Sequence, residues 1–161
     1  MKNTFLFILI FSVLAFSCKK SSPELQVGSE YNEKKSIKEL SQKVHEIWED
    51  AENTNIEKLK SAHYESPKFS KFGPRISERQ NVSETNKSET AHFSKIKDVK
   101  LVLENLKVDV FENIGIATFY NNYSFIKNGK NIKGKGQVTL AFIKSPDGWK
   151  IIHEHSSPFN D

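Results

Sequence analysis

The chain has 161 residues, and its 24 basic and 20 acidic side chains give a formal net charge of +4. Because the two signs are interspersed along the chain, the composition gives no support for nucleic-acid binding. A single cysteine, Cys18, excludes an internal disulfide, so the core has to stabilise the fold.

Residues 1–17 have the pattern of a secretory signal peptide, with Lys2 before a short apolar run and Ala15-Phe16-Ser17 before Cys18. The run is shorter than the roughly 20 apolar residues that cross a bilayer. One interpretation is lipid attachment at Cys18, which makes the protein an exported, membrane-anchored lipoprotein of a bacterial cell envelope. The other is ordinary cleavage and a soluble secreted protein. We favour lipidation, because a free thiol is a liability in an oxidising compartment.

Residues 18–35 are polar, and we interpret them as a flexible tether before a single domain over residues 36–161. Ser36 and Glu39 have the spacing of a capping box and predict the start of a helix. Apolar residues follow at helical spacing on one face: Ile37, Leu40, Val44, Ile47, Trp48 and Ala51. Thr54-Asn55 repeats the capping pattern before a shorter helix that ends near His63.

The next segment carries weaker signals. Phe69 and Phe72 predict a short strand within residues 68–74. Residues 76–93 are rich in serine, glutamate, threonine and asparagine, so we predict a loop with a weak helix near residues 84–93.

From Lys95 the apolar pattern has a period of two, which is typical of strands. A break in the alternation at Glu104-Asn105 indicates a β-bulge, and Asn128-Gly129 predicts a tight hairpin. Helices followed by an antiparallel meander make the fold class α+β. Four lysines lie around the hairpin, at Lys127, Lys130, Lys133 and Lys135. They could attract a polyanion, but we favour a solvated hairpin whose charges protect a strand edge.

The strand patterns are apolar on parts of both faces of the sheet. Ile116 and Ile126 point one way, whereas Ala117, Phe119 and Phe125 point the other way. Helices can cover one face, and a homodimer formed through the sheet is a candidate cover for the other.

Several motifs resemble one family. The most specific is the segment from Gly148 to Ser157, and Trp48-x-x-Ala51 and Lys71-Phe72-Gly73 accompany it. Together they resemble the SnoaL-like branch of the nuclear-transport-factor-2-like superfamily. The resemblance implies a cone, in which a curved antiparallel sheet wraps around N-terminal helices and encloses a pocket. It also implies frequent dimerisation through the sheet. The family includes isomerases, cyclases, dehydratases and proteins without known catalysis, so the fold does not fix the function.

His153 and His155 are two residues apart on a predicted strand, so we expect both side chains on the face that carries Trp149 and Ile151. They could act as a general acid or base in the pocket. They could also bind a metal, or simply be satisfied by structural hydrogen bonds, which is the interpretation we favour.

A metal site would need a third ligand from a distant residue such as His63, His92 or a carboxylate. We therefore expect no metal and no cofactor. Asp109 and Glu154 are candidate carboxylates only through their position on strands, where solvation or ion pairing is the simpler interpretation.

The preferred function is non-catalytic: a small apolar ligand or a protein partner binds to the domain. The residues expected to contact a ligand are Trp48, Phe119, Trp149 and His153, and we expect Trp149 to be buried against Trp48 or Leu40. The alternative is a small enzyme of the isomerase, cyclase or dehydratase type. Its catalytic candidates are His153, His155 and Tyr120, although Tyr120 and Tyr123 lie on opposite faces of their strand.

Overall fold

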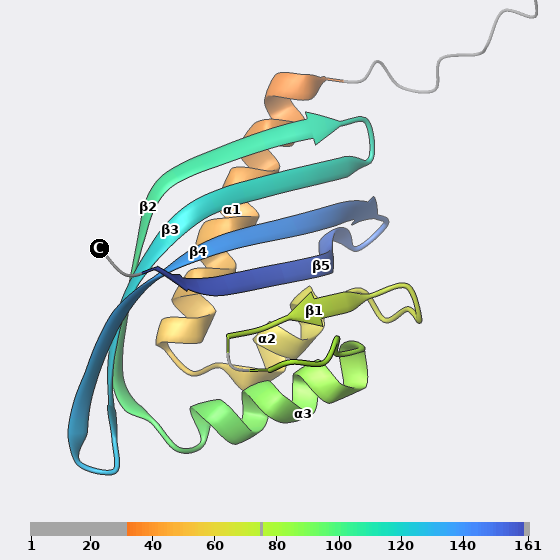
Figure 1. The fold of residues 1–161 in the computed structure, drawn as a ribbon. Coiled ribbons are helices and arrows are strands. Elements are labelled where there is room, and N and C mark those ends of the chain that lie inside the picture. The colour runs from red at the N-terminus through yellow and green to blue at the C-terminus, as the bar shows by residue number, and fades with distance from the viewer. Residues whose placement is uncertain (1–31, 75, 160–161) are drawn as a thin grey trace, which may run out of the picture. The chain divides into compact units, whose positions relative to one another are not determined.

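The computed structural model describes residues 32–74 and 76–159. Cys18 and the predicted signal peptide lie outside these residues. The described part holds three helices and five strands in the following order (Figure 1): α1 (Glu33–Glu52), α2 (Ile56–Ala62), β1 (Ser70–Phe72), α3 (Val82–Phe93), β2 (Lys97–Phe111), β3 (Ile114–Lys127), β4 (Lys130–Ser145) and β5 (Gly148–Phe159).

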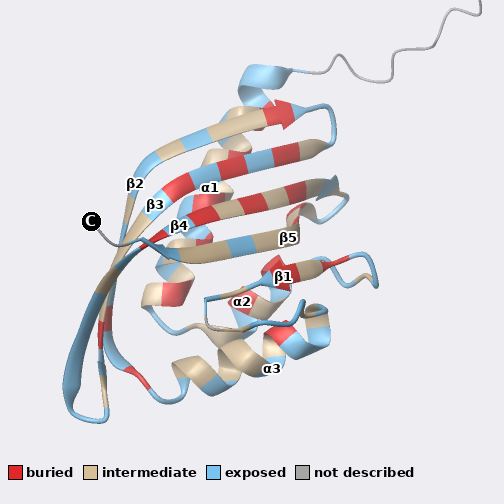
Figure 2. Ribbon diagram, viewed as in Figure 1, coloured by how far each residue is buried: buried red, intermediate tan, exposed pale blue. Residues whose placement is uncertain are grey.

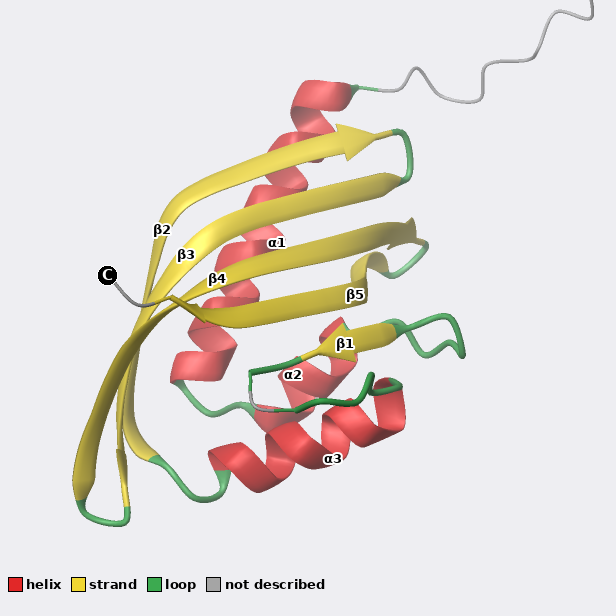
Figure 3. Cartoon of the chain, viewed as in Figure 1, coloured by secondary structure: helices red, strands yellow, loops and turns green. Residues whose placement is uncertain are grey.

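The strands form one sheet in the order β1-β5-β4-β3-β2. Strands β2 to β5 are an antiparallel meander, and the short β1 pairs in parallel with β5. The long strands curve around the helices (Figure 3), which confirms the predicted α+β cone. Within residues 32–74 and 76–159, no helix has the length and apolarity needed to cross a membrane.

Helix α1 begins at Glu33, three residues before the predicted start at Ser36. The side chain of Asn32 accepts a hydrogen bond from the backbone N–H of Lys35, 3.0 Å away, and so caps the helix. Ser36 is buried inside the first turn instead. Residues 33–35 are therefore helical and not part of a tether, because the sequence offers two capping residues, Asn32 and Ser36, and the earlier one is used.

Helix α3 is longer than the predicted weak helix. A capping box starts it: Asn81 Oδ1 accepts from the backbone N–H of Glu84 at 3.0 Å, and Glu84 Oε2 accepts from that of Asn81 at 2.9 Å. At α2 the predicted cap is absent, since the side chain of Asn55 makes no cap bond and instead donates to Asp50 Oδ1 at 3.4 Å.

The turn and bulge signals of the sheet are confirmed. The register of β2 and β3 shifts between Glu104 and Lys107, with Asn105 at a φ of 55°. Asn128 and Gly129 join β3 to β4 with positive φ values of 50° and 73°. A further shift occurs between β4 and β5, where Ala141 pairs with His153 but Phe142 pairs with Ile151. Ile152 is the extra residue of this bulge, and the apolar pattern of the sequence does not indicate it.

The main core lies between α1 and the inner face of the sheet, as the buried segments in Figure 2 show. Trp149 is only 4% exposed, which confirms its predicted burial. The side chains of Leu40 and Trp149 pack against the sheet at Gly115. A Cβ atom on this residue would overlap Leu40 and lie 3.4 Å from the Trp149 ring. Trp48 packs edge-on against Phe119 instead, with ring centroids 4.5 Å apart.

Candidate functional site

A cavity of about 530 Å³ lies between the three helices and the concave face of the sheet. Its volume falls within the range of small-molecule sites. Much of the wall is aliphatic or aromatic, including Ile47, Leu59, Phe93, Val99, Leu101 and Phe125. At one end the wall is charged, where His63, Lys71, Glu89 and Glu154 meet.

The bulge at Ile152 decides which residues of β5 face this cavity. Because one extra residue reverses the alternation, Glu154 joins Ile151 among the lining residues, and Ser156 follows it. His153 and His155 then lie on the opposite face. The expectation that these histidines share a face with Trp149 and Ile151 was therefore wrong.

Lys71 holds two carboxylates together at the charged end. Its Nζ atom lies 2.6 Å from Glu89 Oε1 on α3 and 2.7 Å from Glu154 Oε1 on β5. The lysine side chain is only 10% exposed, and the carboxylate side chains are 17% and 15% exposed. One ammonium thus bridges a helix and a strand in a largely water-excluded place.

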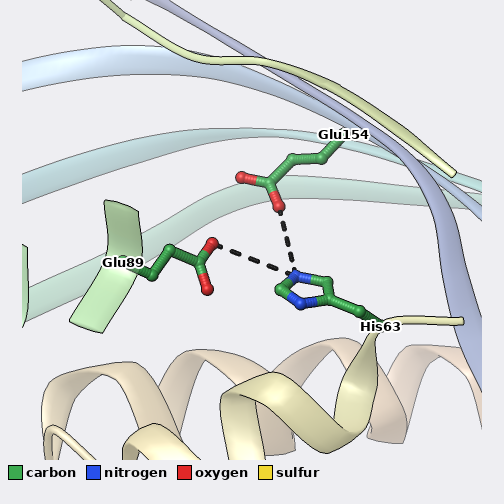
Figure 4. A group of neighbouring side chains, drawn as sticks. All are labelled: His63, Glu89 and Glu154. Carbon is green, nitrogen blue, oxygen red and sulfur yellow. Dashed lines mark ion pairs between the residues drawn. The ribbon is translucent and has the colours of Figure 1, made fainter. Parts of the chain in front are cut away.

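His63 completes the cluster from the residue after α2, as Figure 4 shows. Its ring is buried, and Nδ1 lies 2.9 Å from Asn86 Oδ1 on α3. An amide oxygen only accepts, so this contact assigns the proton to Nδ1. The other nitrogen, Nε2, faces Glu89 and Glu154, with 3.9 Å to an oxygen of each.

The protonation of the ion pair follows from its surroundings. Burial alone would raise the pKa of Glu154, but the charge and hydrogen bond of Lys71 outweigh it and lower this pKa. Burial alone would lower the pKa of Lys71, but the charges of Glu154 and Glu89 outweigh it and raise this pKa. Lys71 is therefore held as an ammonium without a free electron pair, which makes it unsuited to act as an amine nucleophile.

The described residues bring together one set with metal-ligand chemistry: His63, Glu89 and Glu154, whose ligand atoms lie within 4.8 Å of one another. His153 and His155 do not belong to it. The ammonium of Lys71 already supplies positive charge between the two carboxylates. The set therefore does not require a metal ion to balance its charge.

Of the residues expected to bind a ligand, Trp48 lines the cavity, and its Nε1 donates to Asn121 Oδ1 at 3.1 Å. Phe119 and Trp149 lie in the core and are not among the lining residues. The side chain of His153 contacts Ser70, with Nδ1 2.8 Å from the hydroxyl oxygen. That position is outside the cavity.

The remaining candidates also lie apart from the cluster. His155 is exposed beside Phe72, and Tyr120 is 40% exposed beside Phe159. Tyr123 does line the cavity, with its ring over Gly134. Asp109 is paired with Lys107 at the surface.

Two members of the cluster, Lys71 and Glu89, were not among the predicted site residues. A signal for Lys71 was present, because it follows Phe69 by two residues at the start of a short strand and both residues are buried. A charged side chain that points inward from a strand indicates an ion-pair or hydrogen-bond partner in the protein interior. Glu89 carried no such signal, since helix α3 is polar on most of its surface.

Solved structures with similar folds come from several bacteria. A proposed dehydratase of the NTF2-like family from Streptomyces avermitilis is 17% identical, with a TM-score of 0.72 over 81% of this chain and 100% of that one. An NTF2-like superfamily protein from Salmonella enterica is 20% identical, with a TM-score of 0.72 over 80% and 94%. At these identities the similarity shows the fold alone.

A comparison with curated proteins gives no match. The SnoaL-like domain family matches residues 37–161, which is most of the chain and includes every residue of the charged cluster. The protein therefore belongs to the SnoaL-like domain family, within the NTF2-like fold.

Proposed function

We propose that this protein is an envelope lipoprotein whose SnoaL-like domain binds a small, largely apolar molecule. The observation that carries the proposal is the cavity of about 530 Å³, with apolar walls and a charged end. Burial of apolar ligand surface there gives affinity, and the few polar groups orient the molecule.

Binding of the neutral fluorescent probe N-phenyl-1-naphthylamine tests the cavity. We expect its fluorescence to rise on mixing with the protein, and Leu101→Trp to reduce this rise because Leu101 lines the cavity. Val102 is the matched control, since it is the next residue on β2 and is 54% exposed. If Val102→Trp and Leu101→Trp bind the probe equally, the probe occupies a surface site, and the proposal that the cavity binds a ligand is contradicted.

Lipid attachment at Cys18 is the second part of the proposal. It rests on the sequence pattern of residues 1–18. Cys18→Ala should move the protein from the membrane fraction to the soluble fraction of its host. A variant that still sediments with membranes at high salt would place the anchor elsewhere.

A proton-transfer enzyme of the isomerase, cyclase or dehydratase type is a second candidate, favoured by the position of His63. Asn86 orients its ring, and Nε2 faces Glu89 and Glu154, which line the cavity with His63. Because Lys71 lowers the pKa of Glu154, that carboxylate is a weak base, and His63 is the better group for proton transfer.

Exchange of the α-protons of 2-octanone in D₂O, followed by proton NMR, tests this candidate without knowledge of the substrate. An enzyme of this class should accelerate the exchange, and His63→Gln should remove the acceleration. An exchange rate that the native protein leaves unchanged would count against catalysis and leave the binding function intact.

A further inference from the structure

Three acceptor atoms surround a gap at the charged end of the cavity. His63 Nε2 lies 3.9 Å from Glu89 Oε1 and 3.9 Å from Glu154 Oε2. One ligand atom from each of these three residues lies within 4.8 Å of the other two. These separations are too long for hydrogen bonds between the groups, yet one atom placed between them can lie at hydrogen-bond distance from all three.

The protonation pattern makes the gap rich in acceptors. When the ring is neutral with its proton on Nδ1, the Nε2 atom of His63 carries a free electron pair and accepts a hydrogen bond. Ionised Glu89 and Glu154 accept hydrogen bonds but donate none. A bound group that supplies three N–H donors from one atom therefore matches the site, whereas a hydroxyl supplies only one.

The net charge of the cluster also favours a cationic group over an anionic one. Glu89 and Glu154 carry two negative charges and Lys71 one positive charge, which leaves a net charge of −1 when the His63 ring is neutral. Protonation of His63 brings the net charge to zero. In neither state is the cluster positive, so it offers an anionic ligand no net attraction in a place where charges interact strongly.

We propose that the cavity binds a molecule with a primary ammonium group on an apolar body, and that the ammonium donates to His63 Nε2, Glu89 Oε1 and Glu154 Oε2. This inference rests on the proposed binding function and names the ligand class. The bound ammonium brings the charge of the cluster from −1 to zero. Glu89 Oε1 then accepts from both ammonium groups, since Lys71 Nζ lies 2.6 Å from it. The negative charges of the two carboxylates offset the repulsion between the two cations.

Two other cations are less suited to the gap. A divalent ion would give the cluster a net charge of +1 with Lys71 in place, and only three protein ligands face it. Lys135 also lines the cavity, but it is exposed on β4, where solvent screens its charge. The buried cluster therefore decides the preference between ligands.

Calorimetric titration of the purified protein with octylamine, octanol and octanoate at pH 7 tests the inference, with the two ions below their micelle concentrations and octanol below its solubility limit. The three probes share one apolar body and differ in the head group. We expect octylamine to bind roughly tenfold or more tightly than octanol, and octanoate to bind weakest, because hydrogen bonds between charged groups exceed those of a neutral hydroxyl.

Glu154→Gln should remove most of the preference for octylamine over octanol, and circular dichroism checks that the variant is folded. The control is Glu57→Gln, because Glu57 is an acidic residue at the surface of α2. If octanoate binds as tightly as octylamine, or if Glu154→Gln keeps the full preference, the inference is wrong while the proposed function stands. If zinc chloride binds and displaces octylamine, the cluster is a metal site instead. If none of the three probes binds, the proposed function itself fails.

Discussion

Lys71 decides the energetics of the charged cluster. A buried ammonium between two carboxylates compensates three desolvation penalties at once, and the loss of one partner leaves charges without compensation. The ion pairs also join β1, α3 and β5, which surround the charged end of the cavity. The cluster is thus both a part of the site and a contact between elements.

Lys71→Met should lower the free energy of unfolding by about 3–5 kcal/mol, since it leaves Glu89 and Glu154 buried without their cation. Urea denaturation followed by circular dichroism measures the change. Lys107→Met is the control, because Lys107 pairs with Asp109 at the surface and such pairs contribute about 0–1 kcal/mol. Similar losses in the two variants would contradict the role given to Lys71.

The pH dependence of stability should change sign in the same variant. In the native protein the pKa of Glu154 is lowered, so its contribution is present above the ordinary value of 4.5 and is lost as the pH falls further. The pKa of Lys71 is raised, so its contribution is present below the ordinary value of 10.5 and is lost at higher pH. Stability should therefore be greatest between these values.

Without Lys71, burial raises the pKa of Glu154, and protonation of the carboxyl removes an uncompensated charge. Lys71→Met should then become more stable as the pH falls from 7 towards 5, while the native protein does not. Urea midpoints at a series of pH values check this. Parallel curves for the two proteins would refute it.

At the scale of single residues, the sequence predicted burial better than site membership. Trp149 was placed correctly, because an exposed tryptophan is costly even at the start of a strand, where the first side chain is normally exposed. His153 was placed on the wrong face, because one extra residue at Ile152 reverses the alternation and leaves no composition signal. Lys71 and Glu89 meet only through tertiary structure, since they lie 18 residues apart on different elements.

Among the elements, α3 positions the site while having few apolar residues of its own. It carries Asn86, which orients His63, and Glu89, which pairs with Lys71. Its polar composition is the reason that the sequence predicted only a weak helix. The capping box of Asn81 and Glu84, which was not part of the sequence-based prediction, starts this helix because it satisfies backbone donors that would otherwise lack partners.

Asn81→Ala should reduce the free energy of unfolding by about 1 kcal/mol, the usual cost of removing an N-cap. Because α3 holds Asn86 and Glu89, octylamine binding should also weaken. Ser83→Ala is the control, since Ser83 is exposed in the same turn and takes no part in the capping box. Equal stability of the two variants would show that the cap does not anchor α3.

At the scale of the molecule, period-two strands and the Asn128-Gly129 turn were sufficient to predict the meander, because neighbouring strands in it are also neighbours in sequence. The parallel pairing of β1 with β5 was not predicted, because three residues carry too little pattern. The cavity was expected only through the family resemblance, since its walls come from segments far apart along the chain.

The outer face of the sheet leads to the last prediction. Ile116 and Tyr120 on β3 are 36% and 40% exposed, and Phe159 on β5 is 38% exposed with its ring 6.0 Å from that of Tyr120. Exposed apolar residues that gather on one face are typical of an interface. We therefore expect two copies to dimerise through this face, and light scattering at high micromolar concentration should give the mass of a dimer.

Tyr120→Lys should shift that mass towards the monomer, because a dimer would bury two added charges without partners. Tyr64→Lys is the matched control: Tyr64 is 36% exposed and follows α2, outside the sheet. Circular dichroism distinguishes a change of oligomeric state from a loss of folding. A native protein that scatters as a monomer would end the dimer proposal, and a dimer that survives Tyr120→Lys would place the interface elsewhere. In either case the cavity on the opposite face would be unaffected, since Tyr120 does not line it.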